Sequence, residues 1–232
     1  MQEEAFGILP KENIYENTGT QIMQINSLYQ LLAYRKFRPK VFSKAAKLLF
    51  MPDLITYYLT GQIQAEYTIA STSQLMDMKT GKWSQKILEA FDISPELLGD
   101  IVQPGTVTGK LTKEVADEIG CDLIPVVAVG SHDTASAVAG APASRQKHWA
   151  FLSSGTWSLM GVEYPKATIN DKSFEYEFTN EGGVGGTIRL LTNVTGLWLV
   201  QQCRSYWAEQ GAELSYSELV EMARSCEPFK AK

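Results

Sequence analysis

Apolar and polar positions alternate with helical spacing along the first part of the chain. The apolar residues of segment 22–32 recur every three or four positions, which predicts a helix. A second amphipathic helix is predicted over residues 48–61, ending at Gly61, and Ser94 is a good N-cap for another helix. Segment 61–83 is polar and rich in Thr and Ser, which predicts a loop with short strands lining a region open to solvent. The pattern leaves open whether that loop faces a ligand or is an ordinary connector.

From residue 105 onward, the pattern alternates between strand and helix. A helix capped by Thr112 and ended by Gly120 is followed by the continuous apolar run Pro125 to Val129, which predicts a buried strand. A helix of small residues follows from Thr134. The succession of strand, helix and buried strand is typical of an α/β architecture.

The last part of the chain predicts strands followed by helices. Two strands flank the turn Ser153 to Thr156, and segment 185–194 predicts a strand that enters a helix begun by Gly196. Ser215, with a glutamate three residues later, forms a capping box for a final helix. The polar segment Ala141 to His148 is the candidate boundary between two domains, residues 1–143 and 144–232.

Composition narrows the classes of function. The 232 residues are 44% hydrophobic and 20% charged, with a net charge of −5, which is ordinary for a globular protein and gives no sign of a nucleic-acid partner. Three cysteines, with no Cys-x-x-Cys pair, argue against a disulfide framework and a zinc site. The acidic N-terminal residues lack a signal peptide's apolar stretch, and no apolar run is long enough to span a bilayer. We therefore expect a cytoplasmic protein without a membrane partner.

Three segments resemble known phosphate-binding, dinucleotide-binding or hydrolase motifs, but their residues do not have the spacing that those motifs require. Gly105 and Gly109 are separated by three residues where a phosphate-binding P-loop requires four, and Leu111 stands where that loop needs a Ser or Thr. The glycine-rich segment 181–186 precedes a strand and not a helix, so a dinucleotide site is not indicated. Ser131 lacks the G-x-S-x-G context of a hydrolase nucleophile.

One pair of residues has the position of a site. The run Val126 to Gly130 delivers His132 and Asp133 to the carboxyl end of a predicted strand, where ligands bind in open α/β sheets. Asp133 also precedes a helix, whose dipole favours an ionised carboxylate that is able to act as a general base. Asp133 is also suited to be a helix N-cap, and on spacing alone the cap is slightly favoured over the base. His132 taken alone is more typical of a packed residue than of a proton carrier.

Other polar residues are weaker candidates for phosphate or ribose contacts. In the turn Ser153 to Thr156 a glycine lets backbone amides approach an anion, although a plain hairpin turn explains the same residues. Asn193 lies at a predicted strand end, and Gln201 lies eight residues later in the following helix. Their amides suit hydrogen bonds to oxygens of a nucleotide, and also those of ordinary helix starts.

Taken together, the phrases "VGSHDTASAV", "LSSGTWSLMG", "FTNEGGVGGTIRLLTNVTGLWL" and "FMPDLITYYLTG" resemble the FGGY family of carbohydrate kinases over essentially the whole chain. The resemblance implies an α/β actin-like ATPase (ribonuclease H-like) fold with two domains. Residues 1–143 would be the latter part of the N-terminal, sugar-binding domain, and residues 144–232 the opening part of the C-terminal, ATP-binding domain. The implied reaction is transfer of the γ-phosphoryl group of ATP, with Mg²⁺, to the 1-hydroxyl of L-rhamnulose in L-rhamnose catabolism.

The resemblance also implies roles for individual residues. Asp133 matches the base that takes the hydroxyl proton and, like His132, contacts the sugar, whereas Thr156, Asn193 and Gln201 match ATP-binding positions. Metal ligands are not identified by it, and it implies no obligate protein partner.

The resemblance is incomplete at both ends of the chain. The family's N-terminal phosphate hairpin and its C-terminal adenine site have no counterpart here, so we expect a fragment that has no kinase activity by itself. Two alternatives stay open: a kinase for another ketose, such as xylulose or fuculose, and a non-catalytic actin-like nucleotide-binding module.

Overall fold

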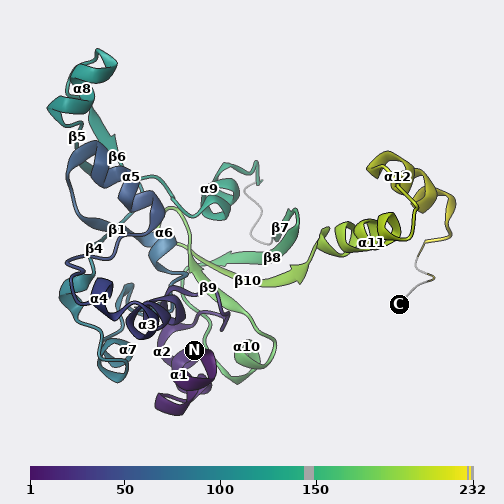
Figure 1. Ribbon diagram of the computed structural model, residues 1–232, viewed down its shortest axis with the longest axis horizontal. Coiled ribbons are helices and arrows are strands. Elements are labelled where there is room, and N and C mark those ends of the chain that lie inside the picture. Colours follow the sequence, from purple (N-terminus) through teal and green to yellow (C-terminus); the bar gives the residue numbers. More distant parts are fainter. Residues whose placement is uncertain (144–148, 229, 231–232) are drawn as a thin grey trace. The chain divides into compact units, whose positions relative to one another are not determined.

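The computed structural model describes residues 1–143, 149–228 and 230, which form two compact units (Figure 1). Unit 1 comprises Met1–Phe151 and Met160–Thr192, and unit 2 comprises Leu152–Leu159 and Asn193–Lys232. The domain boundary predicted between residues 143 and 144 falls at residues 144–148, outside the described residues, so it stays a prediction.

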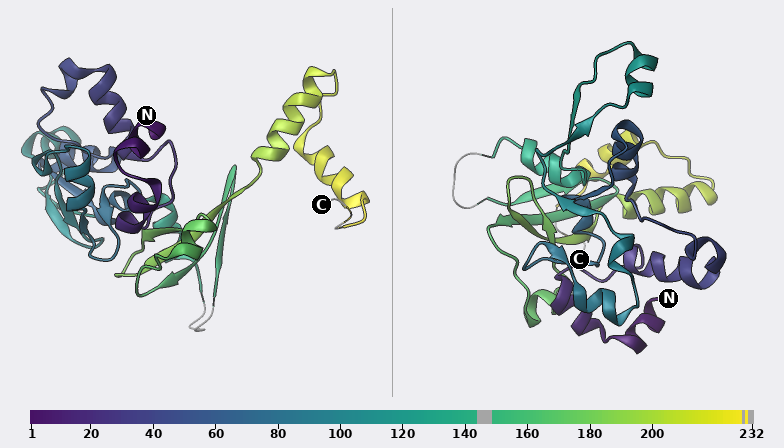
Figure 2. Two further views of the ribbon diagram at one scale, coloured as in Figure 1. Left: turned by 90° about the horizontal axis from the view of Figure 1, so that it is seen from below. Right: turned by 90° about the vertical axis from the view of Figure 1, so that its left-hand side faces the viewer.

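The elements follow one another in a mixed order of helices and strands (Figures 1 and 2). The first part contains α1 (Gln2–Ile8), α2 (Lys11–Thr18), α3 (Ser27–Phe37), α4 (Pro39–Phe42), α5 (Met51–Thr60), β1 (Gln64–Glu66), α6 (Tyr67–Ala70), β2 (Met76–Asp77), β3 (Lys82–Trp83), α7 (Gln85–Ala90), the 3₁₀ turn η1 (Pro95–Leu97), β4 (Asp100–Val102), β5 (Val107–Lys110), α8 (Lys113–Ile119), β6 (Pro125–Val127) and α9 (Asp133–Gly140). The second part contains β7 (Phe151–Ser154), β8 (Trp157–Tyr164), α10 (Asp171–Glu175), β9 (Thr179–Gly182), β10 (Ile188–Thr195), α11 (Trp198–Glu209) and α12 (Tyr216–Ser225).

The helices near the N-terminus enclose the larger apolar core of unit 1. Ile14 of α2, Leu28 of α3 and Phe91 after α7 are almost fully buried in it. The helix predicted over segment 22–32 exists only from Ser27 onward, as α3. The reason is local: the side chain of Asn26 accepts the amide proton of Met23 at 2.6 Å and so closes a turn ahead of the helix.

Helix ends that depend on local chemistry follow the prediction. Gly61 and Gly120 end α5 and α8 in the left-handed conformation, with φ of 71° and 69°, and Thr112 caps α8 by accepting the amide proton of Val115. The helix predicted from Ser94 is only the 3₁₀ turn η1, because the buried Leu98 turns extended and the chain continues into β4.

The polar segment 61–83 borders an open pocket at Lys79, Thr80 and Gly81, but most of residues 64–76 do not face solvent. It forms β1, α6, β2 and β3, and most of its residues from Gln64 to Met76 are buried. Its hydroxyl groups bond to nearby backbone instead of water: Ser71 Oγ donates to the carbonyl of Thr68 and Ser73 Oγ to that of Ala70, each at 2.6 Å. The Thr/Ser-rich composition therefore indicates a satisfied buried turn.

Two small sheets differ in direction. β1 pairs in parallel with β4, whereas β6 pairs antiparallel with β5 in a sheet of two strands. The prediction that the strand from Pro125 to Val129 is buried is therefore wrong, since β6 has a single neighbouring strand and Val127 is 46% exposed. An apolar run predicts a strand, but not the number of neighbours that cover it.

A larger sheet has the strand order β7-β8-β10-β9. Its edge hairpin joins β9 to β10 in antiparallel register, with Arg189 directly opposite Glu181 and Ile188 opposite Gly182. As predicted, the glycine-rich segment feeds a strand: Gly185 and Gly186 both have a positive φ in the turn before β10. The register places the Arg189 and Glu181 side chains on one face of the hairpin.

Unit 2 contains the predicted turn and the last two helices (Figure 2). Gly155 and Thr156 form the turn between β7 and β8, and their carbonyls accept the amide protons of Leu197 and Trp198 at the start of α11. The Ser215 capping box at α12 is present as predicted.

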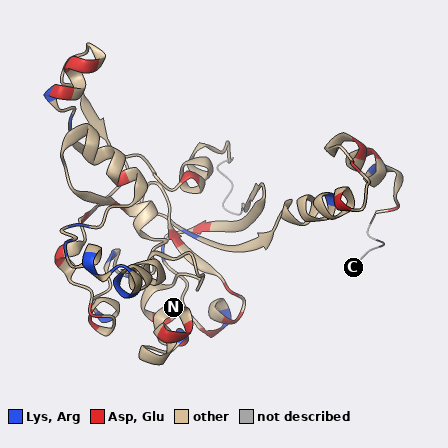
Figure 3. Ribbon diagram, in the orientation of Figure 1, with Lys and Arg blue, Asp and Glu red and all other residues tan. Residues whose placement is uncertain are grey.

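Charged side chains of both signs share the helices of unit 1, as on α8 (Figure 3), where Lys113 Nζ lies 2.6 Å from Asp117 Oδ2. Such exposed pairs contribute little to stability.

None of the helices in the described part of the chain combines the length and the apolar character that a membrane crossing requires.

A buried carboxyl group lies between α5 and β1. Asp53 is 1% exposed, and its Oδ1 accepts the amide proton of Glu66 at 3.0 Å, while its Oδ2 has no hydrogen-bond partner among the described residues. The pKa of Asp53 is raised to about 6, chiefly by burial and in smaller part by the negative charge of Glu66, against the lowering effect of the backbone hydrogen bond.

We predict that Asp53 makes the free energy of unfolding depend on pH. Because its pKa is raised in the folded state, the folded chain holds a proton that the unfolded chain has released, and the stability that Asp53 contributes is lost as the pH rises from about 4 to about 6. Urea unfolding over this range should show the parent chain falling in stability relative to Asp53→Asn. Asp117→Asn on the surface of α8 controls for the loss of one carboxylate. A constant difference between parent and Asp53→Asn across that range would contradict the prediction.

Candidate active site

The predicted pair His132 and Asp133 lies where the chain enters α9. His132 occupies the N-cap position in an extended conformation, and Asp133 is the first residue of the helix. Asp133 is therefore not the N-cap, although its Oδ1 accepts the amide proton of Thr134 at 2.7 Å. Its side chain is 97% exposed. One carboxylate oxygen is tied to the first turn of α9, and the group as a whole is open to a ligand.

Glu66 holds the backbone that leads to this pair. Its Oε2 accepts hydrogen bonds from the amide and the hydroxyl of Ser131, at 3.1 and 2.6 Å, and from the hydroxyl of Thr68 at 2.5 Å. The Thr68 oxygen in turn accepts the amide proton of His132 at 3.0 Å. Glu66 also caps α6 by accepting the amide protons of Thr68 and Ile69. One buried carboxylate thus joins α6 to the segment before α9.

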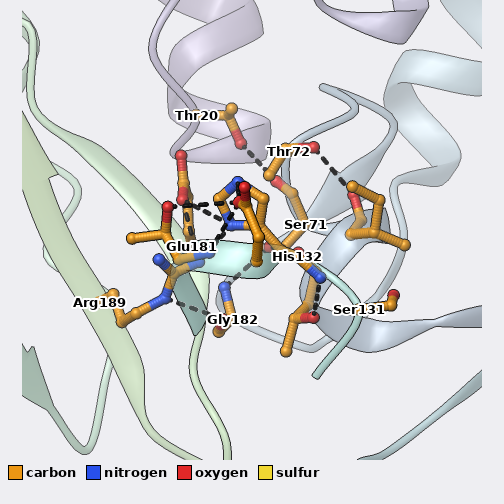
Figure 4. Close-up of polar contacts among 12 residues, drawn as sticks. Thr20, Ser71, Thr72, Ser131, His132, Glu181, Gly182 and Arg189 are labelled. Carbon is orange, nitrogen blue, oxygen red and sulfur yellow. Dashed lines mark hydrogen bonds and ion pairs between the residues drawn. The ribbon is translucent and has the colours of Figure 1, made fainter. Parts of the chain in front are cut away.

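The β9–β10 hairpin approaches the same histidine (Figure 4). Arg189 Nη2 lies 2.7 Å from His132 Nδ1 and donates to Glu181 Oε2 at 3.0 Å, while its Nε donates to the carbonyl of Gly182 at 3.2 Å. Arg189 is 0% exposed. A buried guanidinium needs hydrogen-bonded and charged partners. Glu181 and Gly182 supply them to Nη2 and Nε, whereas Nη1 has no hydrogen-bond partner among the described residues.

The hairpin is also bonded to the end of α6 (Figure 4). The amide of Gly182 donates to Ser71 Oγ at 2.8 Å, and the hydroxyl of Thr20 donates to the Ser71 carbonyl at 3.1 Å. A Cβ on Gly182 would lie 2.5 Å from the ring of Tyr67, so the close approach requires glycine. We call this connected set of buried polar groups the polar web; its members are Thr20, Glu66, Thr68, Ser71, Ser131, His132, Glu181, Gly182 and Arg189.

The web determines the charge of His132. Burial lowers the pKa of the imidazole, and the positive charge of Arg189 acts in the same direction, against Glu181 and Asp133, which raise it. The ring is therefore neutral at neutral pH and contributes hydrogen bonds to the site, not a charge.

The residues expected to contact ATP all lie in unit 2. Gln201 Nε2 donates to Thr156 Oγ1 at 3.4 Å, so the structure brings these two together at the start of α11. Gly196 lets the turn approach this closely, since a Cβ there would lie 2.5 Å from the carbonyl oxygen of Gly155. Asn193 is half-buried on β10, three residues before Gly196.

The described residues fit a magnesium ion only in part. No group of three or more His, Cys, Asp or Glu side chains able to hold a metal occurs within residues 1–143, 149–228 and 230. Mg²⁺ is commonly bound through one or two carboxylates together with phosphates of the substrate. The open Asp133 carboxylate is one oxygen donor in the site, and the described residues by themselves build no metal cage.

Sequence reasoning identified Asp133 and His132 but missed the side chains that hold them. Arg189 stands between apolar residues in "TIRLLTNV", and a charged residue inside an apolar strand is a signal of a buried partner. Glu66 gives a weaker signal, because the burial of that segment was not predicted. Glu181 stands at the edge of a glycine-rich run, and nothing in its spacing indicates the pair with Arg189.

Comparison with known families supports the predicted kinship. The sequence matches the FGGY family of carbohydrate kinases, N-terminal domain, over residues 7–140, and its C-terminal domain over residues 150–231. It is 46% identical over 229 residues to a rhamnulokinase of Bacteroides thetaiotaomicron, covering 99% of this chain and 46% of that protein. It is 39% identical over 224 residues to a rhamnulokinase of Halalkalibacterium halodurans, covering 97% of this chain and 47% of that protein. The chain thus spans about half the length of these curated relatives.

Solved structures share the fold at low sequence identity. A xylulose kinase from Lactobacillus acidophilus matches with a TM-score of 0.80 at 21% identity, over 97% of this chain and 45% of that one. A glycerol kinase from Plasmodium falciparum, solved with ADP, matches with a TM-score of 0.74 at 17% identity, over 97% of this chain and 45% of that one. The predicted α/β actin-like fold class is confirmed.

We predict that Glu66→Gln destabilises the chain. The carboxylate accepts hydrogen bonds on both oxygens, so an amide nitrogen in place of one oxygen faces a buried donor and leaves it unpaired. The expected loss in the free energy of unfolding is about 1–3 kcal/mol. Urea denaturation should detect it, with the exposed Glu89→Gln on α7 as the matched control. Equal stabilities of the two variants would show that Glu66 does not hold the segment.

Proposed function

The chain belongs to the FGGY family of carbohydrate kinases, and from this premise we propose that it serves the transfer of the γ-phosphoryl group of ATP to the 1-hydroxyl of L-rhamnulose. Support for the sugar comes from the rhamnulokinases that match nearly the whole chain at 46% and 39% identity. The observation that carries the proposal is the open Asp133 carboxylate at the start of α9, beside a neutral His132 held by buried partners.

In the proposed reaction, Asp133 acts as the general base. Oδ1 is occupied by the amide of Thr134, which leaves Oδ2 to take the proton of the 1-hydroxyl. As the proton moves, the sugar oxygen bonds to the γ-phosphorus and the bond from that phosphorus to the β,γ-bridging oxygen breaks, releasing ADP. Phosphoryl transfer needs positioning and charge stabilisation more than covalent help, so one oriented carboxylate suffices on the sugar side.

His132 is the proposed second sugar contact, since a neutral ring beside the carboxylate offers a hydrogen bond to a neighbouring sugar oxygen. Its 21% exposed side chain is consistent with partial access for a ligand.

Thr156, Asn193 and Gln201 are the proposed ATP contacts. The exposed Thr156 hydroxyl and the Gln201 amide form one polar surface at the start of α11. Mg²⁺ would be held mainly by the phosphates of ATP, and its chemistry would be to neutralise charge on the transferring group. A place in L-rhamnose catabolism and a cytoplasmic location accompany the substrate assignment as parts of the same proposal.

We predict that Asp133→Asn lowers kcat by at least about 100-fold in the gene product that carries this chain, because an amide does not accept the hydroxyl proton. A coupled ADP-release assay measures the loss, and Asp171→Asn on the surface of α10 is the control. Retention of turnover by Asp133→Asn would exclude the proposed base.

The same assay with a panel of ketoses tests the substrate and the two alternatives. L-Rhamnulose should give a higher kcat/KM than D-xylulose or L-fuculose. A preference for another ketose would replace the proposed sugar, and nucleotide binding with no turnover of any ketose would favour a non-catalytic module.

A further inference from the structure

The buried Arg189 has no part in the reaction proposed above, yet it contacts His132, which is a proposed sugar-binding residue. It stands opposite Glu181 in the β9–β10 register and is fully buried. Its Nη2 serves two partners, Glu181 Oε2 at 3.0 Å and His132 Nδ1 at 2.7 Å. Arg carries five N–H donors, no acceptor, and a charge that persists in proteins.

The contact with His132 determines which ring nitrogen carries the proton. Because Arg189 can only donate, a separation of 2.7 Å requires Nδ1 to accept with its lone pair. The opposite arrangement, an Nδ1–H donating to Glu181 Oε2 at 3.5 Å, would set two N–H groups against each other at the shorter distance. The proton of the neutral ring therefore lies on Nε2.

The other side of the ring then presents a donor next to the proposed base. Nε2 lies 3.9 Å from Asp133 Oδ1, which is too long for a hydrogen bond. The Nε2–H group is thus not used up by Asp133, and it projects beside a carboxylate that is 97% exposed.

We propose that Arg189 is a positioning residue that acts through His132, holding the ring in its Nε2–H tautomer so that it donates a hydrogen bond to a sugar oxygen adjacent to the hydroxyl that Asp133 deprotonates. The tautomer follows from the geometry of this chain alone, whereas its role toward the sugar rests on the proposed function. Glu181 neutralises Arg189 and does not itself accept a proton from the ring.

The first test reads the tautomer directly and needs no activity. The sequence has two histidines, so ¹⁵N-labelled chain should give two imidazole patterns in long-range ¹H–¹⁵N correlation spectra, with His148→Gln identifying His132. At neutral pH we expect the Nε2–H pattern for His132. An Nδ1–H pattern or a protonated ring in the parent chain would overturn the proposal without any variant of Arg189.

Variants separate Arg189 from Glu181. Arg189→Gln should shift His132 toward a mixture of tautomers, whereas Glu181→Gln should keep the Nε2–H form because the donor to Nδ1 remains. An unchanged Nε2–H tautomer in a folded Arg189→Gln variant would contradict the proposal. Arg224→Gln, at an exposed arginine on α12, is the control for loss of one cation. If Arg189→Gln does not fold, the parent spectrum and Glu181→Gln still decide.

The role toward the sugar is tested in the gene product that carries this chain. Losing one oriented hydrogen bond should raise KM for L-rhamnulose by about tenfold in Arg189→Gln, with KM for ATP unchanged. An equal rise in both constants would indicate a merely structural role. If His132 has the Nε2–H tautomer but no ketose is phosphorylated, the proposed function is contradicted and the tautomer assignment stands. If L-rhamnulose is phosphorylated but His132 has the Nδ1–H tautomer, the tautomer assignment is contradicted and the proposed function stands.

Discussion

A guanidinium group buried without access to water constrains the whole site. Arg189 has to be neutralised and hydrogen-bonded, and the antiparallel register of β9 and β10 places Glu181 opposite it for that purpose. The remaining donor on Nη2 reaches His132, and Nε reaches the carbonyl of Gly182. The amide of Gly182 donates a hydrogen bond to Ser71 at the end of α6. At the start of α6, Glu66 accepts a hydrogen bond from the hydroxyl of Ser131. The partners of one buried charge thus join a hairpin, a short helix and the segment that carries Asp133.

The parts of this structure that could be predicted are those in which neighbouring residues determine the conformation. The left-handed glycines 61 and 120, the Thr112 cap and the Ser215 capping box all follow from residues within one turn of each other. Asp133 was identifiable for the same reason, as a carboxylate between a strand and a helix. Contacts between distant segments were not predictable in this way: Glu66 and Ser131 are 65 positions apart, and His132 and Arg189 are 57 apart. The burial of β6 failed as a prediction because burial depends on neighbouring strands, not on the apolar character of the strand itself.

The chemistry proposed here divides between the two units. The proposed sugar contacts, Asp133 and His132, belong to unit 1, where a hydrogen bond from the His132 amide to Thr68 holds the backbone. The proposed ATP contacts, Thr156, Asn193 and Gln201, belong to unit 2, where the turn between β7 and β8 is bonded to the start of α11. Such a division suits phosphoryl transfer, in which the protein mainly positions two substrates and stabilises charge between them.

The central claim is that the sugar meets His132 and Asp133 together. The most direct test follows the His132 Nε2 resonance of the gene product that carries this chain during titration with L-rhamnulose in the absence of ATP. The account predicts that L-rhamnulose shifts that resonance saturably and that D-xylulose at the same concentration shifts it less. A resonance that does not respond to saturating L-rhamnulose, or that responds equally to both sugars, would contradict it.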